Sequence, residues 1–206
     1  MGRALRLDDV LSDPRIWRGK AANQTPDGLS TGHVALDAAL PGGGWPRSAL
    51  SEILLPADGI GELRLLLPAL GELSRQSGNV VLIDPPYTPF PLAWQAQGLD
   101  LARLQIVDSG GRDSLWSAEQ CLRAGACAAV LLWPRQADDR ALRRLQVAAE
   151  SGQSMGFVCR DARHAGQSSP VALRLRLHAR PVEIEVLKCR GAAPPTQRIP
   201  FADGRH

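Results

Sequence analysis

Residues 49–73, ALSEILLPADGIGELRLLLPALGEL, decide the fold that this sequence predicts. They have the outline of a buried strand, a turn with two glycines, and a helix whose leucines recur at helical spacing. This local arrangement holds nucleotide phosphates when the turn reads G-x-x-x-x-G-K-[ST]. Backbone N–H groups then wrap the phosphates, the lysine neutralises their charge and the hydroxyl binds Mg²⁺.

The residues that would hold phosphates are absent from this turn. Gly61 matches the second glycine, but Glu62 stands at the lysine position and Leu63 at the hydroxyl position. The first glycine falls on Pro56, or on Leu55 in a loop one residue longer. A carboxylate facing a triphosphate opposes binding. The sequence therefore predicts a degenerate P-loop without a nucleotide cofactor, in which Glu62 complements the positive start of the helix.

Alternating strands and helices follow this stretch. Four short apolar runs lie at residues 79–84, 103–107, 128–133 and 155–159. Strands that are apolar on both faces, alternating with helical patterns at 114–124 and 137–150, are typical of a parallel sheet covered on both sides. The predicted fold class is α/β, with a mostly parallel sheet flanked by helices.

Beyond residue 170 the apolar period changes to two. Residues 171–177 and 182–188 each place apolar side chains on one face, which predicts two antiparallel, half-buried strands. With Leu177 paired to Val182, Arg174 would lie opposite Glu185 on the exposed face. These C-terminal strands complete the predicted sheet.

Composition predicts three regions in the chain. Residues 1–28 form an N-terminal arm and linker, residues 29–190 the core domain, and residues 191–206 an irregular, proline-containing tail. In the arm, Ile16, Trp17 and Arg18 either pack on their own domain or dock a partner protein.

Charge and cysteine usage bound the classes of function. The net charge is +3, no apolar run reaches the length of a membrane span, and the N-terminus lacks a signal-peptide pattern, so we expect a cytoplasmic protein without a membrane partner. The four cysteines are widely spaced, which predicts reduced thiols and no metal site. Residues 160–206 hold eight arginines and one lysine against two aspartates and two glutamates, which suggests an anionic partner. The candidate binding residues are Arg160, Arg163, His164, Lys188 and Arg190.

The sequence also lacks the acids of nucleotide hydrolysis. The apolar run 128–133 ends in Trp133 where a metal-holding aspartate would stand, and Asp84 is followed by Pro85 and Pro86. One acid without a lysine, hydroxyl or metal makes no phosphoryl-transfer site. We therefore expect a protein that is not an enzyme.

The stretch STGHVALDAALPGGGWPRSALSEI, residues 30–53, resembles the segment that precedes the P-loop in the RecA recombinases. Later elements follow in RecA order over residues 28–200. With GIGEL, residues 59–63, in place of the P-loop, the chain resembles the ImuA family of translesion DNA synthesis-associated proteins. The catalytic glutamate of RecA falls near Pro86, its strand-end aspartate matches Trp133, and its late lysine pair matches Lys188 and Arg190.

This resemblance implies a RecA-like fold that has lost its ATPase and acts as an accessory factor of SOS-induced, error-prone translesion synthesis. The implied partners are an ImuB-type relative of the Y-family polymerases, an error-prone C-family DNA polymerase and RecA itself, so the protein would join the nucleoid when in complex. RecA-like domains also pack head to tail, which makes self-association an expectation.

Two alternatives remain open from the sequence. One is a DNA-binding module of the mutagenic repair complex, although the two DNA-binding loops of RecA are shortened here to residues 134–139 and 160–170. The other is an inhibitor of cell division that resembles SulA and acts on FtsZ. Salt-dependent DNA affinity would favour the first, and loss of FtsZ polymers would favour the second.

Overall fold

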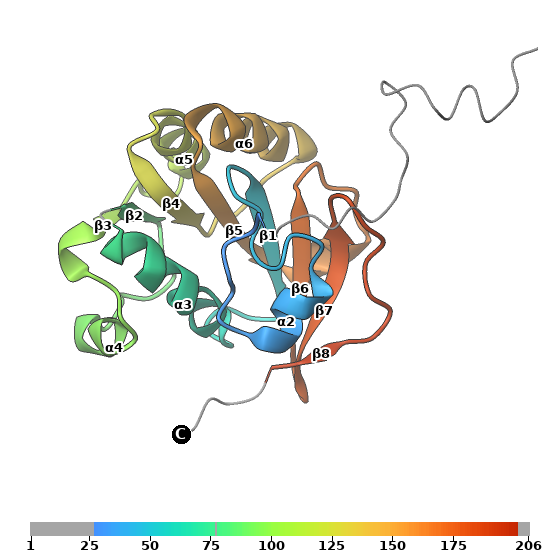
Figure 1. Cartoon of the computed structure of the whole chain (residues 1–206). Coiled ribbons are helices and arrows are strands. Elements are labelled where there is room, and N and C mark those ends of the chain that lie inside the picture. The colour runs from blue at the N-terminus through green and yellow to red at the C-terminus, as the bar shows by residue number, and fades with distance from the viewer. Residues whose placement is uncertain (1–26, 77, 202–206) are drawn as a thin grey trace, which may run out of the picture.

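One mixed sheet organises the part of the chain that the computed structural model describes, residues 27–76 and 78–201. Its eight strands lie in the order β3-β2-β4-β5-β1-β6-β7-β8 (Figure 1). Strands β1 to β6 run parallel, and β7 and β8 are antiparallel to their neighbours. The strand bounds are Leu50–Leu55 (β1), Asn79–Ile83 (β2), Leu104–Val107 (β3), Cys127–Leu132 (β4), Met155–Asp161 (β5), Leu173–Ala179 (β6), Val182–Cys189 (β7) and Ile199–Pro200 (β8).

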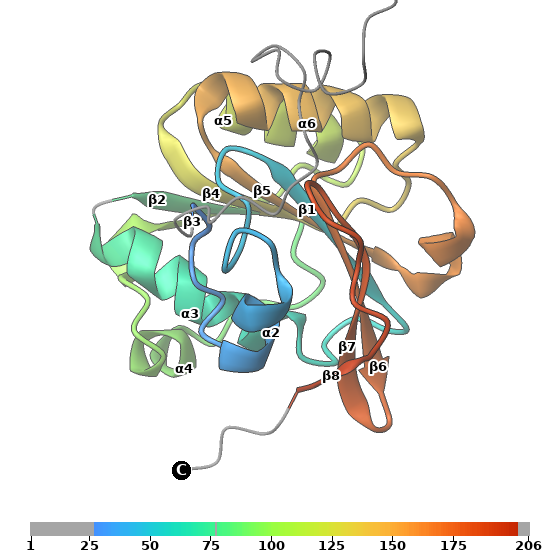
Figure 2. The same cartoon turned by 45° about the vertical axis from the view of Figure 1, so that its right-hand side comes forward.

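Helices cover both faces of the sheet, as predicted. Figure 2 shows α5 and α6 on one face and α2, α3 and α4 on the other. The α-helix bounds are Val34–Ala39 (α2), Glu62–Arg75 (α3), Pro91–Ala96 (α4), Ser114–Arg123 (α5) and Asp139–Gly152 (α6). Two short 3-10 helices, η1 (Leu101–Arg103) and η2 (Ala162–Gly166), lie in the connections. Helix α4 was not predicted, because its six residues are too few to show a period.

Strand β1 lies between β5 and β6, and all six of its residues are buried. Alternate β1 side chains enter the two hydrophobic cores: Ile53 packs with α3 on one face, and Leu50 packs with α5 and α6 on the other. The stretch that predicted the fold is therefore central to the sheet, and the turn after β1 opens at the edge where the parallel strands end.

The β6–β7 pairing differs from the predicted register. Leu177 pairs with Ile184, since the strands continue to Ala179 and Val182 and leave a two-residue turn. Arg174 then pairs with Lys188, and its side chain is buried. The prediction of an exposed Arg174 opposite Glu185 was wrong, because β6 is covered on that face by the η2 segment, whose carbonyls accept hydrogen bonds from Arg174.

The tail is more regular than predicted up to Phe201. Strand β8 pairs with β7, and Ile199 and Phe201 are buried in the core. Their apolar side chains pack beside α2 and α3. The proline-rich sequence has no apolar period that would have predicted this packing. The predicted docking residues Ile16, Trp17 and Arg18 lie outside the described residues.

Candidate functional site

The turn between β1 and α3 has the backbone shape of a phosphate-binding loop. Gly59 has φ 79° and Gly61, the N-cap of α3, has φ 129°. These conformations need glycine, since a side chain would be strained there. In P-loop proteins the backbone N–H groups of such a turn, at the start of a helix, bind phosphate.

Glu62 fills this position with its own carboxylate. Its Oε1 accepts a hydrogen bond from the Gly59 N–H at 2.9 Å, and its Oε2 accepts one from the Gly61 N–H at 3.2 Å. Glu62 is only 1% exposed. Glu62 thus lies in the first turn of α3, and its carboxylate occupies two of the backbone donors of this turn.

Two aromatic side chains enclose the same turn. Tyr87 lies over Gly59, where an added Cβ would come within 3.3 Å of its Cε2. Phe201 lies beside Gly61 and below Arg64, whose guanidinium is 4.2 Å from the ring centroid. A triphosphate with Mg²⁺ does not fit these residues, because it would have to displace a buried carboxylate, and Glu62 and Leu63 stand at the lysine and hydroxyl positions of a P-loop.

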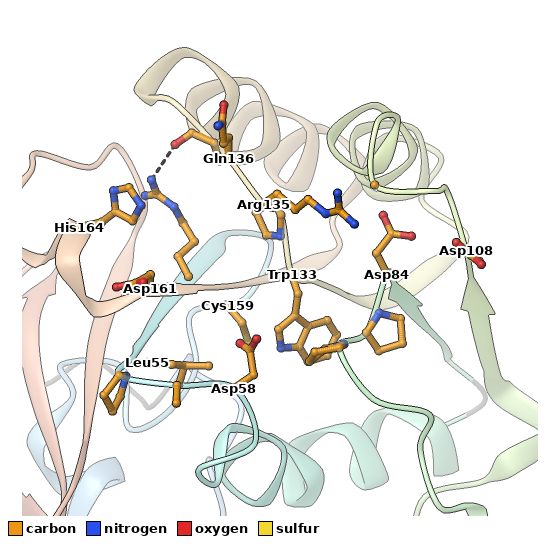
Figure 3. A pocket seen from close by; sticks show the side chains of 18 of the residues that line it. Leu55, Asp58, Asp84, Asp108, Trp133, Arg135, Gln136, Cys159, Asp161 and His164 are labelled. Carbon is orange, nitrogen blue, oxygen red and sulfur yellow. Dashed lines mark hydrogen bonds between the residues drawn. The ribbon is translucent and has the colours of Figure 1, made fainter.

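A cleft of about 730 Å³ opens beside this turn, at the carboxyl ends of the parallel strands. Figure 3 shows Trp133 in its wall, between Asp84 and Cys159. Trp133 is 8% exposed, and Pro86 lies at the rim. Burial, with smaller contributions from Glu62 and Asp58, raises the pKa of the Cys159 thiol well above its usual value, so this thiol stays protonated at neutral pH.

Asp84 joins two strand ends in this cleft. It has a left-handed backbone with φ 48°, and its carboxylate accepts hydrogen bonds from the Ser109 N–H at 2.7 Å and the Ser109 hydroxyl at 2.5 Å. The carboxylate is thus used to hold the turn after β2 against the turn after β3. Asp84 thus has a structural role at the end of β2.

A buried group of three charges lies beneath the cleft. Glu52 of β1 is fully buried and accepts hydrogen bonds from Arg160 of β5 and Arg174 of β6, each at 2.5 Å. Arg160 also donates to the Ala137 carbonyl at 2.7 Å, and Arg174 donates to the carbonyls of the η2 segment. Through these two arginines, Glu52 links the adjacent strands β5, β1 and β6 to the β4–α6 loop and to the η2 segment.

The structure divides the predicted cationic candidates. Arg160 is not on an open loop, because β5 extends to Asp161 and places the Arg160 side chain 5% exposed against Glu52. Its prediction as an exposed binding residue was wrong for this reason. Arg163, in contrast, has a side chain that is 70% exposed, and the His164 ring hydrogen-bonds the Gln167 side chain at 3.0 Å.

The other two candidates are engaged in contacts within the chain. Lys188 donates to the Ser169 carbonyl at 2.6 Å, and Arg190 forms an ion pair with Glu150 at 3.1 Å. Burial first, and the nearby Arg190 and Arg174 charges second, lower the pKa of Lys188. Both side chains therefore anchor the C-terminal strands, and the structure does not bring them into the same cleft as Arg163.

Sequence reasoning missed Glu52. The signal was a lone acid within the apolar strand LSEILL, which becomes costly unless a cation reaches it. It also missed Arg135 and Arg140, which lie near Arg163 in space. Nothing local marks either residue.

The fold and the turn together define a RecA-like α/β domain whose phosphate loop is closed by its own carboxylate. A family model described as the cell division inhibitor SulA matches residues 48–156, and the chain belongs to this family. In the described residues, no helix is long and apolar enough to cross a membrane.

Sequence comparison also finds RecA proteins. RecA of Rubrobacter xylanophilus is 35% identical over 115 residues, which cover 55% of this chain and 33% of that protein. RecA of Bacillus licheniformis is 32% identical over 117 residues, with the same shares. The chain thus spans about a third of the length of the RecA proteins it matches. The predicted resemblance to RecA is confirmed.

Among solved structures, a SulA protein is similar over part of the chain. SulA from Pseudomonas aeruginosa is 28% identical, and the match covers 56% of this chain and 98% of that one, with a TM-score of 0.46.

Proposed function

We propose that this protein is a non-catalytic accessory protein of the DNA damage response that binds partner proteins through its RecA-like domain. The observation that carries the proposal is the Glu62 carboxylate, which accepts hydrogen bonds from Gly59 and Gly61 in the place of a phosphate. A domain that fills this site with its own side chain would act by binding partner proteins on its surface and not by binding or hydrolysing a nucleotide. The similarity to RecA and to the SulA family supports the link to DNA damage.

Within that response, the proposed role is error-prone translesion synthesis. The support is the GIGEL turn that resembles the ImuA family, together with Leu63, Pro86 and Trp133 at the other positions that ATP hydrolysis would need. An ImuB-type polymerase relative, a C-family polymerase and RecA are the proposed partners. Affinity purification from damaged cells, followed by mass spectrometry, would test this set, and recovery of none of the three would contradict it.

Titration of the protein with Mg·ATP is expected to give no heat of binding. The physical reason is that ATP would have to expel the Glu62 carboxylate from two backbone donors and then hold its phosphates close to that displaced negative charge. Isothermal titration calorimetry measures this directly, with a RecA protein as the positive control. Saturable binding of Mg·ATP, or an ATPase rate that Glu62→Gln abolishes, would refute the proposal.

A second candidate function follows from the SulA family match over residues 48–156. In this alternative the protein binds FtsZ and prevents its assembly. Sedimentation of FtsZ polymers with and without the protein separates the two. The accessory role predicts an unchanged pellet, whereas the alternative predicts a pellet that shrinks in proportion to the added protein.

A further inference from the structure

A second groove, of about 710 Å³, lies beside the cleft and is strongly cationic. The β4–α6 loop, the first turns of α6 and the η2 segment form its walls. Its lining includes Asp138, whose carboxylate already caps α6 by accepting from the Ala141 N–H at 2.7 Å. The cationic side chains are Arg135, Arg140, Arg144, Arg160 and Arg163.

Several of these cations are not neutralised within the described residues. Arg135 and Arg140 are exposed and form no ion pair there. Arg163 approaches the exposed Asp161 only at 3.9 Å. Surface pairs of that length contribute little, so the Arg163 charge remains available to a ligand.

The groove also has a buried positive charge beneath it. Arg160 lines the groove, and it shares the single Glu52 carboxylate with Arg174. Two guanidinium groups against one carboxylate leave one positive charge in a poorly solvated place. Such a charge acts over a longer range than an exposed one, since little water screens it.

We infer that this groove binds an acidic segment of a partner protein. Arginine forks match carboxylates in bidentate geometry, and here arginines of α6 and of η2 line the same groove. This inference rests on the proposed function and identifies the class of partner segment. The groove volume suits a short segment rather than a long strand.

Two observations favour an acidic peptide over nucleic acid. First, the described residues that line the groove include no Phe, Tyr or Trp, so its lining offers single-stranded bases no large aromatic platform besides the His164 ring. Second, the adjoining cleft carries Asp58, Asp84, Asp108 and Asp161. A phosphodiester chain that continued from the groove into this cleft would bring its phosphates close to these four carboxylates. A peptide can instead carry acidic residues only over the part that lies in the groove.

Binding of a fluorescein-labelled peptide with an Asp-Glu-Leu-Asp repeat to the full chain tests this inference. We expect saturable fluorescence anisotropy that falls with added salt, and no binding of the Asn and Gln counterpart of the peptide. The double variant Arg140→Glu with Arg163→Glu is expected to weaken binding by about tenfold or more, since it reverses one charge on each wall. Both side chains are exposed, and a glutamate at 140 suits the start of a helix.

A charge-matched control is available in the same chain. Arg47→Glu with Arg198→Glu changes the net charge equally, and both side chains are exposed and do not line the groove. We expect this control to bind the peptide within about twofold of the unmodified protein, because distant exposed charges are screened.

Three outcomes would overturn the inference: no binding of the acidic peptide, equal weakening in both double variants, or binding of an oligo-dT strand in preference to the peptide with the same dependence on Arg140 and Arg163. The milder pair Arg140→Gln with Arg163→Gln, with melting followed by circular dichroism, separates a binding defect from a folding defect. A failed peptide assay with an unchanged absence of Mg·ATP binding would reject this groove and leave the accessory role standing.

Discussion

Replacement of Glu52 by glutamine is expected to lower the free energy of unfolding by about 3–5 kcal/mol. The amide keeps the volume of the side chain but removes the charge that Arg160 and Arg174 share, and both guanidinium side chains are 5% exposed. Their charges would then be buried without compensation. Because a domain is stable by only about 5–15 kcal/mol, the variant should lose a large part of its stability. Equilibrium unfolding in urea measures the loss.

Asp139→Asn is the matched control for this prediction. It removes a carboxylate from a solvent-exposed pair with Arg143, at 3.0 Å, and should cost under about 0.5 kcal/mol. A double-mutant cycle with Arg160→Met sharpens the comparison, since removal of one cation should recover part of the Glu52→Gln loss. A Glu52→Gln cost as small as that of the control, or strict additivity in the cycle, would show that the three charges are not coupled.

Replacement of Glu62 by alanine is expected to cost about 1–3 kcal/mol and to create an anion site. The Gly59 and Gly61 N–H groups would lose their acceptor inside a turn shaped for a phosphate. Added phosphate should then bind the folded state and raise the melting temperature of the variant, because a ligand of the native state stabilises it. Differential scanning calorimetry in phosphate and in chloride of equal ionic strength provides the measurement.

The unmodified protein is the necessary comparison, because phosphate also stabilises folded proteins by exclusion from their surface. Only the extra rise in the variant reports a bound anion. Glu72→Ala on the same helix removes a half-buried carboxylate that contacts Gln76, and it should show no extra rise. An equal phosphate response in all three proteins would mean that Glu62 does not occupy a phosphate position.

The sequence predicted the parallel part of the sheet well because that part is encoded locally. Each core strand is a short apolar run, and each helix α3, α5 and α6 carries its own period, so the order of elements follows from the chain alone. The closed phosphate turn is equally local. Glu62 reaches Gly59 and Gly61, which are at most three residues away.

Features made by distant residues were beyond the sequence. The β6–β7 register was missed by two residues because either pairing keeps the same side chains on the buried face. Phe201 was assigned to an irregular tail. In the structure it follows β8 and packs beside Gly61, a residue far away in the sequence. Both depend on which surfaces are left to cover once the sheet has formed.

By itself, the sequence determined that this chain forms a RecA-like sheet and that its phosphate turn carries an acid instead of a lysine. Only the tertiary structure decided which charges are buried and which stay exposed. Arg160 and Arg174 are 108 and 122 residues from Glu52, and they meet it because β1 lies between β5 and β6. That strand order removes Arg160 from the surface and gathers Arg135, Arg140 and Arg163 into one groove. The sequence shows which residues carry a charge, but the packing of strands that are far apart in the chain decides which opposite charge each of them meets.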